Sequence, residues 1–175
     1  MKKRFLIISS ISFLAVLVID QISKYLIIKK IPETGIFLLE DFLSFNLTFN
    51  YGIGFGLLLP SWTITVLTVG LIGLLVYLLI NQIKQRLYLT SFLISLVTAA
   101  ALSNFTDRLF RGGVVDFVSI QINSFTWPSF NFADIVITVS AIILIFITFN
   151  KNSQKKIYEK NISSFIFLLT SFFMF

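Results

Sequence analysis

The side chains of this sequence that could carry out chemistry are carboxylates, amides and cations, because the chain contains no Cys and no His. These absences exclude a thiol nucleophile, a disulfide, an imidazole base and the usual zinc ligands. Catalysis would therefore depend on carboxylates, Lys, Arg, Tyr or hydroxyl groups, and we expect no metal ion and no cofactor. The candidate site residues are Asp20, Lys24, Asn50, Gly52, Asn104, Asp107, Arg108, Asp116, Asn131 and Asp134.

Two groups of these residues have helical spacing. Asp20 and Lys24 are four residues apart, which lets them pair on one helix face. Asn104, Asp107 and Arg108 would also share a face, where the planar guanidinium could donate two parallel hydrogen bonds to a carboxylate. Either group could instead be structural, as an ion pair, a helix end or an Arg that reaches the lipid headgroups.

Two further carboxylates lie later in the chain. Asp116 follows Gly112-Gly113, and Asp134 opens an apolar segment one helical turn after Asn131. Taken singly, Asp134 could stabilise a helix N-terminus, and Asp116 could be a loop residue that faces water.

The composition of the chain indicates that these residues lie in a membrane protein. The chain is 57% hydrophobic and 13% charged, and its mean hydropathy is +0.93. Apolar runs long enough for a bilayer core lie at about residues 5–28, 62–80, 87–103 and 130–149. We therefore expect an all-α membrane protein with four transmembrane helices in one domain, residues 1–161, whose first span is retained after insertion. Residues 162–175 form an apolar tail too short for a comfortable span, which we expect at the membrane interface.

The Lys and Arg residues indicate an orientation. Nine lie in the N-terminal tail, the 2–3 loop and the C-terminal tail, whereas four lie in the 1–2 and 3–4 loops. The positive-inside rule then places both termini in the cytoplasm and both longer loops outside. This distribution also explains the net charge of +6 without nucleic acid binding.

The 1–2 loop contains a strand signal. Residues 45–51 alternate apolar and polar side chains, the period of a half-buried strand, and Gly52, Gly54 and Gly56 follow. We expect a small β-sheet in this extracytoplasmic loop, on the outer membrane surface. Seven of the candidate residues would then share one depth near the outer interface, which indicates a polar pocket. They are Asp20, Asn50, Asn104, Arg108, Asp116, Asn131 and Asp134.

Five short elements resemble those of the lipoprotein signal peptidases, also called signal peptidase II. In chain order they are Asp20-Gln21-Ile22-Ser23-Lys24, Asn50-Tyr51-Gly52-Ile53-Gly54-Phe55-Gly56, Asn104-Phe105-Thr106-Asp107-Arg108, Val114-Val115-Asp116-Phe117 and Phe130-Asn131-Phe132-Ala133-Asp134. The chain departs from the family pattern at Ile53-Gly54, where Ala-Ala is usual, and at Ala100–Ser103, where glycines are usual. These departures leave the substrate preference open.

The resemblance implies an aspartic endopeptidase of the bacterial inner membrane. It would remove signal peptides from diacylglyceryl-modified prolipoproteins, just before the lipidated Cys. Asp116 and Asp134 would be the catalytic pair, because two carboxylates held close share one proton and can act as base and acid. Asn50, Arg108 and Asn131 would orient the substrate and the pair, with Asp20 in support. The expected partners are lipidated prolipoproteins and membrane lipids, the site faces the extracytoplasmic side, and the protein is expected to be a monomer.

Three other interpretations stay open. Ser23 beside Lys24 is typical of Ser–Lys catalysis, although adjacent helical residues point about 100° apart; a Ser from another segment could still serve. The carboxylates could instead form an ion or proton pathway in a transporter. The chain could also be a non-catalytic paralogue of the peptidase.

Overall fold

The computed structural model describes residues 2–52 and 59–150 of the 175-residue chain. In this part of the chain, β1 and β2 lie between α1 and α2, α3 follows α2 directly, and β3 and β4 lie between α3 and α4. The element bounds are α1 Lys2–Lys30, β1 Ile36–Leu39, β2 Leu43–Asn50, α2 Ser61–Lys84, α3 Tyr88–Arg111, β3 Val114–Ile122, β4 Phe125–Thr126 and α4 Phe132–Asn150.

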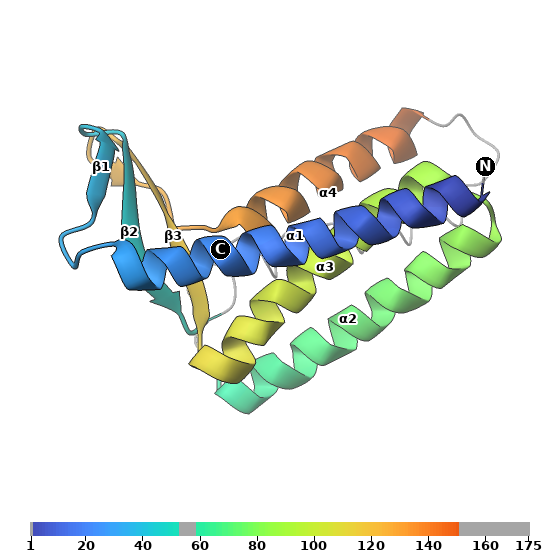
Figure 1. Cartoon of the computed structure of the whole chain (residues 1–175), viewed down its shortest axis with the longest axis horizontal. Helices are drawn as coiled ribbons and strands as arrows, with labels where there is room; N and C mark the ends of the chain where they lie inside the picture. The colour runs from blue at the N-terminus through green and yellow to red at the C-terminus, as the bar shows by residue number, and fades with distance from the viewer. Residues whose placement is uncertain (1, 53–58, 151–175) are drawn as a thin grey trace.

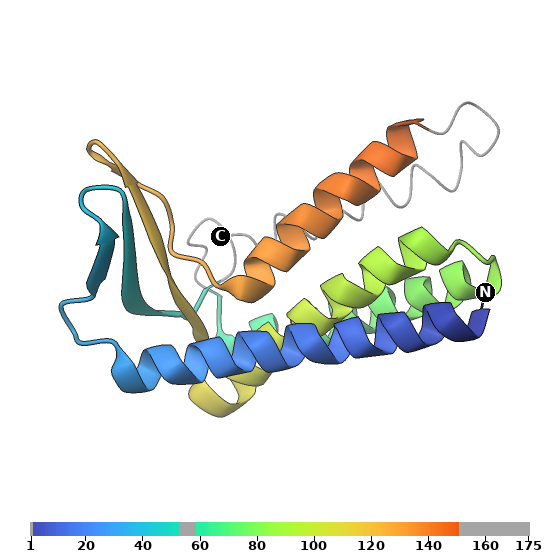
Figure 2. The ribbon, with the colours of Figure 1, turned by 45° about the horizontal axis from the view of Figure 1, so that its top comes forward.

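The helices form an elongated bundle with the sheet at one end (Figures 1 and 2). The start of α1, the α2–α3 connection and the end of α4 lie together at the opposite end. Helix α3 packs against each of the other three helices. It is therefore the centre of the bundle.

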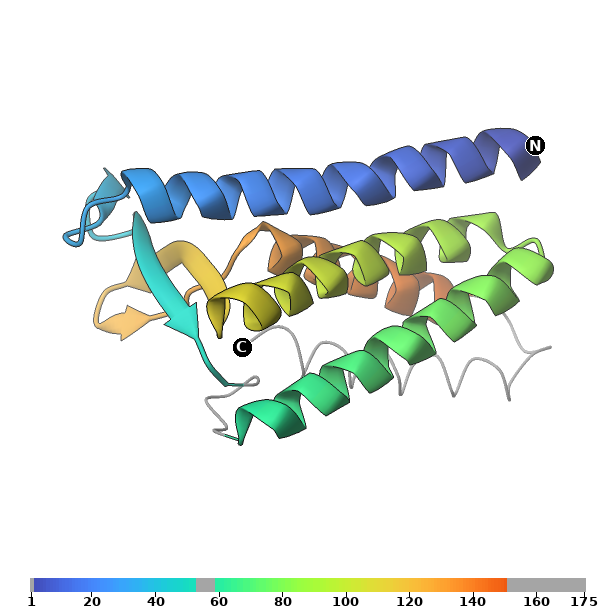
Figure 3. The same cartoon turned by 60° about the horizontal axis from the view of Figure 1, so that its bottom comes forward.

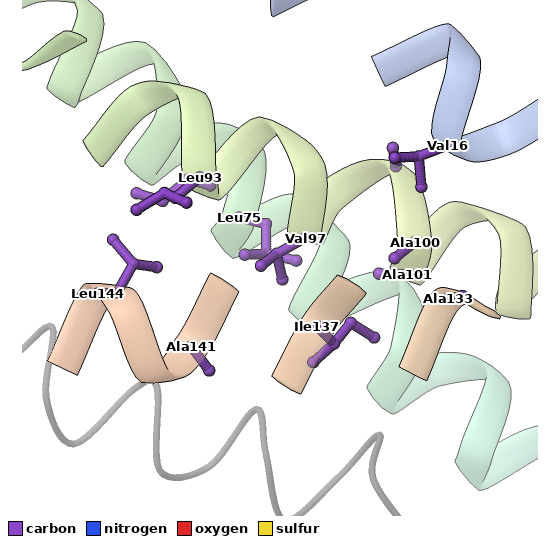
Figure 4. Packing of buried hydrophobic residues seen from close by; sticks show 12 residues of the cluster. Val16, Leu75, Leu93, Val97, Ala100, Ala101, Ala133, Ile137, Ala141 and Leu144 are labelled. Atoms are coloured by element: carbon purple, nitrogen blue, oxygen red, sulfur yellow. The ribbon is translucent and has the colours of Figure 1, made fainter. Parts of the chain in front are cut away.

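The core along α3 uses small side chains so that the neighbouring helices can approach closely. Ala99, Ala100 and Ala101 are completely buried, and Ala133 and Ala141 of α4 belong to the same buried cluster. Figure 4 shows Ala133 beside Ala100 and Ala101. Close backbone approach through small residues is how helices pack in membranes, where lipid supplies no hydrophobic drive for their association. Larger side chains fill the rest of the cluster, namely Val16, Leu75, Leu93, Ile94, Val97, Ile137 and Leu144.

The outward surfaces of the helices are apolar, as expected for contact with lipid. Helices α1, α2 and α3 are each long and apolar enough to cross a membrane, and α4 contains a shorter apolar helix, Phe132–Thr148. We predicted an all-α membrane protein with four transmembrane helices, and the structure confirms a mostly helical protein with three or four apolar helices.

The third predicted span, residues 87–103, ends too early. Helix α3 continues for two more turns to Arg111, so Asn104, Asp107, Arg108 and Arg111 are helical and do not belong to a loop. It continues because the polar side chains of those turns find partners on neighbouring elements. It ends at Gly112, whose left-handed φ of 79° suits glycine. The other predicted spans differ from α1, α2 and α4 by a few residues at their ends.

The small antiparallel sheet is confirmed, but the prediction that it belongs to the 1–2 loop alone is wrong. Its strand order is β1-β2-β3-β4, so the two loops contribute two strands each. The central pairing joins β2 to β3, with Thr48 opposite Asp116 and Asn50 opposite Val114. The strand predicted at residues 45–51 corresponds to β2. Ile53, Gly54, Gly56 and the tail of residues 162–175 lie outside the described residues.

Candidate active site

Lys24 lies at the centre of a buried polar network between α1 and α3. Its Nζ is 2.6 Å from Asp20 Oδ2 and 2.7 Å from Asp107 Oδ2, and it donates to Asn104 Oδ1 at 2.7 Å. All four side chains are almost completely buried. An ammonium group has three N–H donors, and here all three are engaged.

This arrangement bears on Ser–Lys catalysis. Ser23 donates to the backbone carbonyl of Asp20, and Ser103 donates to Asp20 Oδ2 at 2.7 Å. Lys24 has no donor left for a serine and holds two carboxylates, so it is not placed to accept a proton from a nucleophile. The geometry does not support the Ser–Lys alternative.

Asp20 connects this network to α4. Its Oδ1 accepts the backbone N–H of Ala133 at 2.8 Å. The first N–H groups of a helix have no partner within the helix, and they carry partial positive charge. A carboxylate of α1 therefore fixes the start of α4 against the bundle.

Asp107 receives donors from three elements. Besides Lys24, its carboxylate accepts Gln21 Nε2 at 3.0 Å, the backbone N–H of Val115 at 3.2 Å, and the guanidinium of Arg111. Arg111 also donates to Gln21 Oε1 at 3.1 Å. Asp107 thus joins α1 and α3 to the start of β3.

The two candidate catalytic carboxylates are connected through Asn131. Its Nδ2 donates to Asp116 Oδ1 at 2.7 Å, and its backbone N–H donates to Asp134 Oδ2 at 3.0 Å. Asn104 donates to Asp134 Oδ1 at 3.0 Å and accepts Asn131 Nδ2 at 3.2 Å. A single network therefore links Lys24 to both carboxylates through Asn104.

Burial determines the electrostatics of Asp116, which lies on β3 outside the helices. Loss of hydration raises the pKa of its carboxyl to about 6. Hydrogen bonds from Asn131 and Asn50 and the positive charges of Lys24 and Arg108 oppose this rise. A carboxyl whose pKa lies near the working pH is suited to proton transfer.

Arg108 is placed differently from the prediction. Its Nη2 donates to the backbone carbonyl of Gly52 at 3.4 Å, and its Nη1 is buried without a hydrogen-bond partner among the described residues. The predicted fork onto a carboxylate is wrong, because Arg111, one turn from Asp107, occupies that carboxylate. Arg108 instead interacts electrostatically with Asp116 and Asp134, and its Nη1 is left to donate to a substrate.

An apolar cavity of about 190 Å³ lies beside Asp134. It extends along α4 past Ile135, Thr138 and Val139, and Trp127 and Phe130 line it at the sheet end. An extended apolar group could therefore lie along α4 with its end at Asp134.

All ten residues predicted from the sequence lie in or against this one network. Sequence reasoning did not assign a site role to Gln21, Ser103 or Arg111. Arg111 could have been found, because it stands four residues after Asp107 on the same helix. Ser103 is an ordinary helical serine without a local signal. Among the described residues, no group of three His, Cys, Asp or Glu side chains is placed to hold a metal ion.

Two linked, buried aspartates lie beneath the small sheet at one end of the helical membrane bundle. This combination is typical of a class of membrane enzymes. Residues 12–150 match the family model described as Signal peptidase (SPase) II. The chain is 35% identical over 138 residues to a lipoprotein signal peptidase of Burkholderia mallei (strain SAVP1), covering 76% of this chain and 82% of that protein. It is 35% identical over 149 residues to that of Thermodesulfovibrio yellowstonii (strain ATCC 51303 / DSM 11347 / YP87), covering 84% and 95%.

Solved structures agree with these matches. A bacterial membrane enzyme determined by the in meso method at 1.9 Å resolution superposes with a TM-score of 0.70 at 32% identity, covering 83% of this chain and 94% of that one. A 2.3 Å structure described in the same words has a TM-score of 0.70 at 30% identity, covering 83% and 93%. The chain belongs to the signal peptidase II family, and it is a bacterial integral membrane protease.

Proposed function

We propose that this protein removes the signal peptide of diacylglyceryl-modified prolipoproteins by cleaving just before the lipidated Cys. The observation that carries the proposal is the pair of carboxylates, Asp116 and Asp134, joined through Asn131 and buried where the sheet meets the helices. The resemblance of the chain to lipoprotein signal peptidases supports the substrate class.

In the proposed mechanism, the pair shares one proton because two close carboxylates cannot both ionise. The charged carboxylate takes a proton from water as the water oxygen attacks the scissile carbonyl carbon. The protonated carboxylate donates its proton to the carbonyl oxygen. When the tetrahedral intermediate collapses, the C–N bond breaks and the departing nitrogen of the Cys receives a proton from the pair.

The supporting residues would hold the substrate and the pair in place. Asn104 and Asn131 fix the orientation of the carboxylates through the hydrogen bonds described above. We assign the unpartnered Nη1 of Arg108 and the amide of Asn50 to the substrate side of the pair. Asp20 and Lys24 act further away, by holding Asn104 and the start of α4.

The cavity beside Asp134 fits an apolar substrate. A signal peptide or an acyl chain could lie along α4 against Ile135 and Val139, with the scissile bond at the carboxylates. This placement would let the lipid remain in the bilayer during cleavage. A transporter function has no comparable support, because the buried charged residues of the described chain gather at the sheet end and form no path through the bundle.

The membrane arrangement is also a proposal. We infer four spans in the inner membrane, α1 to α4, with both termini in the cytoplasm and the site at the extracytoplasmic side, in a single domain of a monomeric protein. The nine-to-four distribution of Lys and Arg supports this orientation. Reporter fusions after Lys30 should report outside and fusions after Lys84 inside; the reverse result would overturn the orientation.

The experiment that tests the function uses the purified full chain and a lipidated prolipoprotein. Cleavage just before the lipidated Cys is the expected result, and the same prolipoprotein without its lipid should be cleaved far more slowly. Intact lipidated substrate, incubated with folded protein, would favour the non-catalytic paralogue.

A further inference from the structure

A groove runs between α1 and α2 at the end of the bundle away from the sheet. Both helices pack against α3 but hardly touch each other (Figure 3). The groove has a volume of about 350 Å³. Its walls include Phe5 and Phe13 of α1 and Leu79 and Ile83 of α2, and Ser95 of α3 also lines it.

Ser9 lines this groove with an unsatisfied hydroxyl. Its Oγ is buried and has no hydrogen-bond partner among the described residues. Other hydroxyls in these helices donate to the carbonyl one turn earlier, as Thr68 and Thr98 do. An unpaired hydroxyl within a bilayer costs free energy, and a ligand with a hydrogen-bond acceptor would remove this cost at Ser9. Ser9 stands 15 residues before Lys24, roughly 22 Å along α1, so the groove is separate from the active site.

In the sequence, unpaired cations flank two of the residues that line the groove. Arg4 directly precedes Phe5, Lys84 directly follows Ile83, and Arg86 lies two residues further on. All three are exposed and form no ion pair within the described part of the chain. The acidic residues of that part lie on the elements at the sheet end, so none of the described carboxylates neutralises these cations. They are Asp20, Glu33, Glu40, Asp41, Asp107, Asp116 and Asp134.

We propose that the groove between α1 and α2 binds one anionic phospholipid. An acyl chain lies between the helices, an ester carbonyl accepts a hydrogen bond from Ser9 Oγ, and the phosphate lies among Arg4, Lys84 and Arg86. The depths agree: Ser9 lies five residues beyond Arg4, about 7 Å along the helix, and a headgroup layer is about 5–7 Å thick. Membrane topology alone accounts for the cations, but not for the groove or for the unpaired hydroxyl.

Native mass spectrometry of the full chain in detergent tests the proposal with phosphatidylglycerol and phosphatidylcholine of identical acyl chains. The parent should retain one phosphatidylglycerol in preference to phosphatidylcholine. The Lys84→Gln/Arg86→Gln variant should bind phosphatidylglycerol about 25-fold more weakly, roughly fivefold for each cation. The matched control Lys29→Gln/Lys30→Gln loses two cations at the other end of α1 and should bind like the parent.

Two variants test the groove itself. Ser9→Val keeps the volume but removes the hydroxyl, and it should weaken phosphatidylglycerol binding several-fold. Ser10 is exposed and lines the groove, so Ser10→Phe should block the acyl chain without disturbing the fold. Equal binding of the two lipids by the parent, or equal losses in the two double variants, would overturn the site. Unchanged binding in Ser10→Phe would overturn its placement in the groove, even if Ser9→Val does not fold.

Discussion

Asn131 and Asp134 hydrogen-bond each other twice. The backbone N–H of Asp134 donates to Asn131 Oδ1 at 3.0 Å, and the backbone N–H of Asn131 donates to Asp134 Oδ2 at 3.0 Å. This is a capping box in which Asp takes the place of the usual Glu. It begins α4 and at the same time fixes a proposed catalytic carboxylate at the helix end.

The carboxylate pair itself gives the first prediction. Asp116→Asn and Asp134→Asn change little in volume but remove an ionisable group, so each should reduce cleavage of a lipidated prolipoprotein by about 100-fold or more. The double variant should be little worse than either single variant, because the two residues act as a unit. Asp41→Asn, an exposed substitution of the same kind, should cleave normally. Near-parent cleavage by either folded single variant would exclude an aspartate pair as the catalyst.

The double role of Asn131 can be separated by two substitutions. Serine is as good an N-cap as asparagine, but its hydroxyl is too short to reproduce the bond to Asp116. Both Asn131→Ser and Asn131→Ala remove the donor to Asp116 and Asn104, so cleavage should fall at least tenfold in each and both should lose some stability. Asn131→Ala also loses the N-cap, so it should be about 1 kcal/mol less stable than Asn131→Ser. If both variants keep cleavage, the link between the carboxylates has no catalytic importance.

Arg108 and Arg111 offer a matched comparison on one helix. Arg108→Lys keeps the charge but loses the planar guanidinium, so cleavage should fall at least tenfold with little change in thermal stability. Arg111→Lys should mainly lower stability, because Arg111 holds Asp107 and Gln21. Cleavage kinetics and thermal unfolding of both variants distinguish the roles. Normal cleavage by Arg108→Lys would reduce Arg108 to a residue that contacts the membrane interface.

Lys24 should matter chiefly for stability. Lys24→Met leaves Asp20 and Asp107 buried without their shared cation, at a cost of about 3–5 kcal/mol. Adding Asp20→Asn should recover part of that loss, whereas the exposed control Lys30→Met should change stability little. Thermal unfolding measures each effect. If Lys24→Met lost cleavage but kept its stability, the result would instead support Ser–Lys catalysis.

The raised pKa of Asp116 predicts a dependence of stability on pH. Because the folded-state pKa is about 6 and the ordinary value is 3.8, the folded protein binds this proton more tightly than the unfolded chain. The stabilisation is full below about pH 4 and is lost as pH rises through about 6, by roughly 3 kcal/mol. Asp116→Asn lacks this step, so its unfolding midpoint should rise relative to the parent between about pH 4 and pH 8. A constant difference between the two proteins would show that Asp116 is not desolvated.

The sequence by itself determined the class of chemistry and the helical framework. The absence of Cys and His limited catalysis to carboxylates, Lys, Arg, Tyr or hydroxyl groups. The apolar runs predicted the helices, because a bilayer core requires long uninterrupted apolar segments. Local spacing was also enough for the Asp20–Lys24 pair, since helix geometry alone brings residues four apart together.

Only the tertiary structure decided which groups meet at the site. The pairing of β2 with β3 places Thr48 opposite Asp116 across 68 residues of sequence, and no local pattern specifies such a partner. The same holds for the contact of Asp107 with Lys24, which comes from another helix. Local spacing offers Asp107 both Arg108 and Arg111, and the structure pairs it with Arg111, while Arg108 donates to the Gly52 carbonyl. Hydrogen-bond partners in a buried network depend on which elements pack together, and that packing is a property of the whole fold.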